Sequence, residues 1–108
     1  MKPRIRHLGF AAIAASCLLA AQPALADGDV KCGAGPKAGW KKIGEVKKQA
    51  WKQGWEILKV QVEGDCFEVY ARTEQGQAIE AFFHPETLEK LVVYRRGREI
   101  FRKSGFTG

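Results

Sequence analysis

The stretch that decides the fold runs from Trp55 to His84 and reads WEILKVQVEGDCFEVYARTEQGQAIEAFFH. Apolar and polar residues alternate in three parts of it, at 55–63, 66–73 and 78–84. This period of two is typical of β-strands, whose successive side chains point to opposite faces. The links Gly64-Asp65 and Gln75-Gly76 are short enough for antiparallel hairpins. We therefore predict three strands in consecutive order, a β-meander.

The alternation divides the side chains of these strands between two faces. One face is almost wholly apolar, so we expect it to form the hydrophobic core. Its members are Leu58, Val60, Val62, Phe67, Val69, Ala71, Ile79, Ala81 and Phe83.

The segment before the strands has the period of a helix instead. Its apolar residues are Trp40, Ile43, Val46, Ala50 and Trp51. Pro36 suits a first helical turn, and Gly54 offers the left-handed conformation that ends many helices. We predict one amphipathic helix over residues 37–53 that packs on the apolar face of the sheet.

Beyond the third strand, Pro85 interrupts the pattern because proline cannot donate a hydrogen bond to a neighbouring strand. Leu91–Arg95 then resumes as a fourth, edge strand. Residues 98–103 fit a strand end, a short helix or a frayed tail, and the pattern does not choose among them. The predicted fold class is α+β: one N-terminal amphipathic helix on a three- to four-stranded antiparallel meander, within a domain at 37–108.

The first 26 residues have the pattern of a secretory signal peptide. Three basic residues precede the apolar run 8–21, and Ala24-Leu25-Ala26 supplies small residues for cleavage before Asp27. Acylation at Cys17 is a weaker alternative, because no large aliphatic residue stands three positions before it. All 12 acidic residues but only 15 of the 18 basic ones follow Ala26, so the mature chain would carry a charge of +3. We expect a periplasmic or secreted protein without a nucleic-acid partner.

Two cysteines, Cys32 and Cys66, follow the predicted cleavage site. An oxidising compartment favours a disulfide between them, which would pin residues 27–36 as an N-terminal tail. Zinc would need more ligands than these two thiols and His84, the only histidine after Ala26. We therefore predict a disulfide, with no metal and no cofactor.

The order of several motifs resembles small periplasmic proteins of the PepSY domain superfamily. The resemblance rests on Trp40, on VQVEGDCFEVYA at 60–71, on Gly76 and on EAFFHPET at 80–87. His84 stands where the family usually has aspartate, and Leu88 where it has glycine. The resemblance implies a helix followed by antiparallel strands, and a noncatalytic module. PepSY domains occur in protease propeptides, with a proposed inhibitory or chaperone-like role, and in periplasmic proteins.

Catalytic patterns are not apparent in the mature sequence. Ser104 is its only serine and lies far from His84, so we predict that the protein is not an enzyme. A protein or peptide partner is expected instead, bound at an edge strand or at the sheet face that the helix leaves open. Coverage of that face by the C-terminal segment, or by a second copy in a homodimer, is the alternative. The face comprises Glu68, Tyr70, Arg72, Glu80, Phe82 and His84.

A lysine stripe on the predicted helix gives a second candidate surface. Helical spacing brings its members within about 60° of one another. Such a stripe would dock on anionic lipid or cell-envelope polymer, although Glu45 can pair with it as on an ordinary solvated face. The members are Lys37, Lys41, Lys48 and Lys52.

Overall fold

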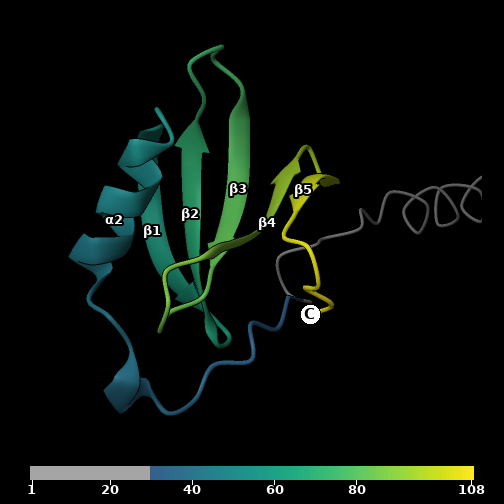
Figure 1. Cartoon of the computed structure of the whole chain (residues 1–108). Coiled ribbons are helices and arrows are strands. Elements are labelled where there is room, and N and C mark those ends of the chain that lie inside the picture. Colours follow the sequence, from purple (N-terminus) through teal and green to yellow (C-terminus); the bar gives the residue numbers. More distant parts are fainter. Residues whose placement is uncertain (1–29) are drawn as a thin grey trace, which may run out of the picture.

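The computed structural model describes residues 30–108, and the predicted signal peptide lies outside this part of the chain. A helix beside an antiparallel sheet makes up the fold, which confirms the α+β class (Figure 1). The elements are η3 (Lys37–Gly39), α2 (Ile43–Lys52), β1 (Glu56–Glu63), β2 (Cys66–Arg72), β3 (Ala78–Phe83), β4 (Lys90–Arg95) and β5 (Arg98–Arg102).

The sheet is a meander in which each strand pairs with its chain neighbour, in the order β1-β2-β3-β4-β5. It has five strands, one more than the upper bound of the prediction. Residues 98–102 form the additional strand because Arg96 and Gly97, with φ of 54° and 77°, make a two-residue turn that pairs Arg95 with Arg98.

The helix is shorter than predicted, because the chain up to Lys42 is held by other segments. Trp40 and Lys42 are extended, with ψ of 148° and 152°. The Trp40 indole N–H donates to the Gly35 carbonyl at 2.9 Å, and the Lys41 amide donates to the Pro85 carbonyl at 2.8 Å. The single helix predicted over 37–53 is therefore interrupted: residues 37–39 form the 3-10 helix η3, Trp40 and Lys42 are extended, and α2 begins only at Ile43.

One hydrophobic core lies between α2 and the sheet, where Val46 and Ala50 are buried. The predicted core positions are confirmed on β2 and β3: Phe67, Val69, Ala71, Ile79, Ala81 and Phe83. On β1 the prediction is confirmed only for Val60, which packs on this core, because a bulge between Ile57 and Lys59 shifts the alternation. Ile57 packs on the core in place of Leu58, which is 49% exposed. Val62, near the end of β1, is exposed as well.

Trp40 and Trp55 contribute to this core by edge-on ring contacts. The ring of Trp40 lies 5.7 Å from that of Phe67, and the ring of Trp55 lies 6.4 Å from that of Phe83. Trp51, which the helical spacing placed on the core side, is 72% exposed. The small side chain of Ala50 lets α2 approach the sheet, and Trp51 on the next position turns away.

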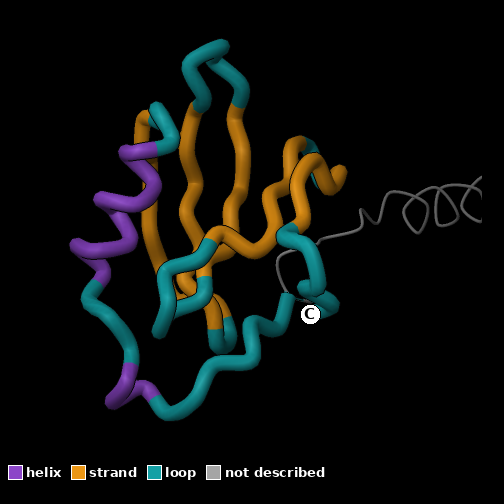
Figure 2. The backbone as a smooth tube through the Cα atoms, viewed as in Figure 1, coloured by secondary structure: helices purple, strands orange, loops and turns teal. Residues whose placement is uncertain are grey.

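A second core covers part of the opposite face of the sheet. Its buried members are Val30, Cys32, Cys66, Phe82, Leu91 and Val92, with Tyr94 and Phe106 packed against them. The first described residues and the C-terminal segment meet here, and Gly108 lies against the carbonyl of Lys31 (Figures 1 and 2). Within residues 30–108, no helix has the length and apolar character needed to cross a lipid bilayer.

Candidate functional site

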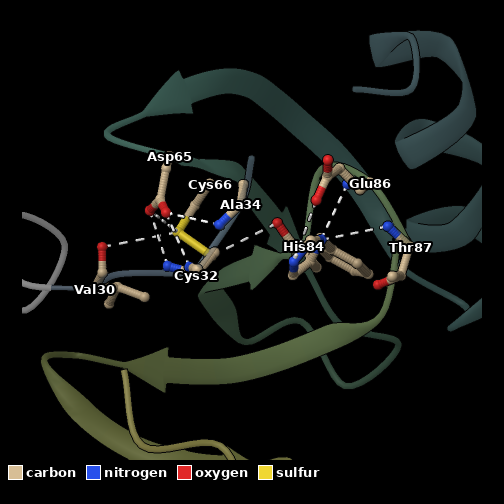
Figure 3. Close-up of a disulfide and its surroundings, with 10 residues drawn as sticks. Val30, Cys32, Ala34, Asp65, Cys66, His84, Glu86 and Thr87 are labelled. Carbon is tan, nitrogen blue, oxygen red and sulfur yellow. Dashed lines mark hydrogen bonds and ion pairs between the residues drawn. A yellow bond between two sulfur atoms is a disulfide. The ribbon is translucent and has the colours of Figure 1, made fainter. Parts of the chain in front are cut away.

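The predicted disulfide between Cys32 and Cys66 is confirmed, with 5.4 Å between their Cα atoms. It attaches the segment before η3 to the start of β2 (Figure 3). Asp65, in the turn between β1 and β2, accepts hydrogen bonds from the amides of Cys32, Gly33 and Ala34 at 2.8, 2.9 and 2.9 Å. A covalent bond and three hydrogen bonds therefore fix residues 32–34 of the N-terminal tail beside the β1–β2 turn.

The contact with the tail amides changes the pKa of the Asp65 carboxyl group. Burial alone would raise its pKa, but the backbone N–H groups of Cys32, Ala34 and Gly33 together outweigh that effect and lower the pKa below 3.8. Potential metal-ligand atoms of Cys32, Asp65 and Cys66 lie within 4.8 Å of one another. The two sulfurs are bonded to each other, so the disulfide accounts for this grouping.

The turn after β3 shows how the chain accommodates its two departures from the PepSY pattern. His84 Nδ1 accepts hydrogen bonds from the amides of Glu86 at 3.0 Å and Thr87 at 3.3 Å (Figure 3). An aspartate side chain makes such local bonds in turns, so His84 fills the same role. Leu88 has a φ of 63°, the left-handed conformation that glycine adopts most readily.

The predicted partner-binding face is largely covered. Phe82 and Glu68 are fully buried, whereas we expected both to be accessible. Phe82 belongs to the second core, where its ring meets Tyr94 edge-on at 6.1 Å. The expectation of an open face was wrong for these two residues, and the alternative of coverage by the C-terminal segment holds in part, because Phe106 packs there. The N-terminal tail covers the same region, where the Cys32–Cys66 disulfide holds it.

The other members of that face differ in exposure. Tyr70, Glu80 and His84 are half-buried, and Arg72 is exposed and pairs with Glu56 at 3.3 Å. Glu68 Oε1 accepts a hydrogen bond from Gln61 Nε2 at 2.8 Å. Glu68 Oε2 has no hydrogen-bond partner among the described residues.

The four lysines of the predicted stripe are all exposed, but they do not share one helix face. Only Lys48 and Lys52 belong to α2, while Lys37 lies in η3 and Lys41 in the extended link between them. The ammonium of Lys37 lies 5.6 Å from the ring centroid of Trp40. The prediction that the four lysines form one stripe along a helix was therefore wrong. That these lysines bind anions stays a prediction.

A groove that the sequence did not reveal lies between the end of α2, the loop before β4 and the edge strand β5. Its volume is about 420 Å³. Every residue of β5 is exposed, and Ile100 and Phe101 keep 50% and 37% of their surfaces accessible. The groove is lined by Gln49, Gln53, Phe83, Thr87, Leu88, Glu89, Lys90, Phe101 and Lys103.

Lys90 connects the two sides of this groove. Its Nζ donates to Gln53 Oε1 at 2.9 Å and lies 4.2 Å from the ring centroid of Phe101. The ring of Trp55 is 5.6 Å away on another side. Partial burial lowers the pKa of Lys90, and no carboxylate within residues 30–108 forms an ion pair with it.

The chain matches one family model, described as "Peptidase propeptide and YPEB domain", over residues 10–93. The match begins within the predicted signal peptide and ends in β4, so β5 lies beyond it. No curated protein and no solved structure has a significant match to the chain. The matched residues cover most of the sequence and include the helix, the first three strands and most of β4. The chain therefore belongs to the PepSY family, that of the peptidase propeptide and YPEB domain.

Proposed function

We propose that this protein is a noncatalytic binding module that captures an extended segment of a protein partner along β5. PepSY domains are propeptide-like modules, which agrees with a binding role rather than a catalytic one. The Cys32–Cys66 disulfide is of the kind that persists in oxidising compartments and supports a periplasmic or extracellular location.

The exposure of β5 is the observation that carries the proposal. Among the described residues, β5 pairs with β4 along one edge and has no strand on the other. An exposed edge offers backbone N–H and C=O groups that an extended peptide can pair with, while pockets beside it select side chains. The groove beside Phe101 provides such a pocket, with Leu88 and Phe83 as its apolar walls.

Lys90 adds a chemical preference to this pocket. An ammonium group has three donors, and the hydrogen bond to Gln53 uses one of them. The partly desolvated charge would be stabilised by a carboxylate from the partner. Lys103 also lines the groove but already pairs with Glu89 at 3.8 Å, so Lys90 is the cation that remains for the partner. The segment that fits best therefore carries an apolar side chain for Phe101 and an acidic side chain for Lys90.

The test uses short peptides selected from a displayed library against the disulfide-bonded protein. Binding of the selected, fluorescently labelled peptides is then measured by anisotropy. Phe101→Ser should weaken binding about tenfold or more, because it removes the apolar wall of the pocket. Lys90→Gln should weaken the binding of acidic peptides but leave the binding of their neutral analogues unchanged.

Trp51→Ser is the matched control, since Trp51 is an exposed aromatic residue that does not line the groove. The control should bind as the unmodified protein does. Selected peptides that respond to Trp51→Ser and not to Phe101→Ser would place the binding surface on α2 and overturn the proposal.

A further inference from the structure

A second hollow, of about 520 Å³, lies where the β2–β3 turn meets the β4–β5 turn. It shares no residue with the groove beside β5 and is lined by Gly76, Gln77, Ala78, Arg95, Arg96 and Arg98. Three of these six residues are arginines, and none is acidic. The arginines follow Val93, where the family match ends, so they are a feature of this chain beyond the matched region.

No carboxylate within residues 30–108 forms an ion pair with these arginines. Within the described part of the chain, none of the three forms an ion pair or a side-chain hydrogen bond, whereas nearby Arg102 pairs with Glu99 at 2.7 Å. Arg95 and Arg98 also stand directly opposite each other across the β4–β5 ladder. Like charges in that position destabilise a strand pair, and an anion bound between the two guanidinium groups would remove this repulsion.

The backbone at the tip of this hairpin carries a second cost. A two-residue turn with positive φ at both positions favours asparagine, aspartate or glycine at the first of them. Arg96 occupies that position with a φ of 54°, which is unfavourable for a side chain of this size. A strained arginine therefore stands between two unpaired arginines at one hollow.

We infer that this hollow binds an oxyanion of phosphate type, a site additional to the proposed peptide groove. Guanidinium groups present planar forks of N–H donors that match the oxygen atoms of phosphate in bidentate fashion. The exposed amide of Gln77 offers a neutral donor on the opposite wall. Bound phosphate would offset the repulsion between Arg95 and Arg98. An isolated surface cation has no such repulsion, so it would gain less from a bound anion.

The test compares two sources of the same chemistry. Pyrophosphate titrated by calorimetry probes a soluble anion, and cosedimentation with phosphatidylglycerol vesicles, against phosphatidylcholine vesicles, probes a lipid headgroup. The double variant Arg96→Asn/Arg98→Ser changes two exposed side chains and should weaken binding about tenfold or more. Arg98→Lys keeps the charge but loses the bidentate N–H donors of the guanidinium group. Its loss of anion binding should therefore lie between those of the parent and the double variant.

The control variant Lys42→Ser/Lys47→Ser removes the same charge at two exposed positions that lie outside both this hollow and the predicted lysine stripe, and it should bind normally. Specific loss in the arginine variant for either probe supports the site and identifies its source. Equal losses in the arginine and lysine variants would show that net charge alone attracts the anion, and the inference would fail. It would also fail if the intact protein bound neither probe.

Discussion

At Arg96 the backbone adopts a conformation that the arginine side chain disfavours. The left-handed conformation at φ 54° is easier for asparagine than for arginine. We therefore expect Arg96→Asn to raise the free energy of unfolding by about 0.5–1 kcal/mol, measured by urea denaturation. Arg96→Gln removes the same charge but keeps a long side chain in the left-handed conformation, so it is the control and should give no such gain. Equal stability of Arg96→Asn and the parent would mean that the turn carries no strain.

Asp65 gives the tail contact a pH dependence. Its pKa in the folded protein lies below the ordinary value of 3.8, because three tail amides donate to the carboxylate. A depressed pKa contributes stability that is complete above the unfolded-state pKa and is lost as the pH falls through the folded-state pKa. The contact should therefore hold at neutral pH and weaken in acid below about pH 4.

Asp65→Asn tests this dependence. At pH 7 the variant should be less stable by about 1–2 kcal/mol, because an amide accepts fewer and weaker bonds than a carboxylate. The difference should shrink when urea denaturation is repeated at pH 3. Glu63→Gln removes a neighbouring carboxylate that forms no ion pair or side-chain hydrogen bond within residues 30–108, and it serves as control. A deficit of the same size at both pH values would contradict the role of the ionised carboxylate.

At the scale of the elements, the covered face of the sheet changes what a mutation there should do. Phe82 is fully buried in the second core, so Phe82→Ala should lower the free energy of unfolding by about 3–5 kcal/mol. Thermal and urea denaturation measure this loss. Tyr70→Ser, at a half-buried position on the same face, should cost less. A folded Phe82→Ala variant of normal stability would mean that this face is open after all.

Local sequence patterns correctly predicted the strands that pack one regular apolar side against the helix. The alternation in β2 and β3 is regular, so the residues of their helix-facing side were all identified. Turn chemistry at Gly64 and Gly76, both with positive φ, correctly separated the strands. The two cysteines, with no competing ligand pairs nearby, were sufficient to predict the disulfide.

The features that the sequence patterns did not predict depend on contacts between distant segments. The bulge in β1 shifted Ile57 into the core, and no local signal marks it. The start of α2 depends on Lys41 bonding to Pro85, and the covering of Phe82 depends on where the tail lies. Both candidate binding sites form where segments distant in the sequence converge. Ile100 and Phe101, an apolar pair among charged residues, are the local signal that could have indicated the groove.

For the molecule as a whole, the disulfide is the main constraint on the unfolded chain. It closes a loop with a sequence separation of 34, which corresponds to about 3–4 kcal/mol in the chain-entropy model. Reduction, or Cys32→Ser/Cys66→Ser, should lower the melting temperature by a corresponding amount, measured with and without reductant. The parent without reductant should resist thiol labelling at both positions. Labelling of both cysteines in the folded, unreduced protein would contradict the bridge.

The one-after-another order of the strands also determines how the sheet can assemble. Each strand pairs only with its chain neighbour, so the sheet grows hairpin by hairpin with small loop-closure entropy. Proteins rich in such local pairings have low contact order and fold quickly. Val30 and Cys32 are different, because they reach Phe82, Leu91 and Val92 across most of the described chain. Assembly should thus proceed from the hairpins outward, with the N-terminal tail docking last.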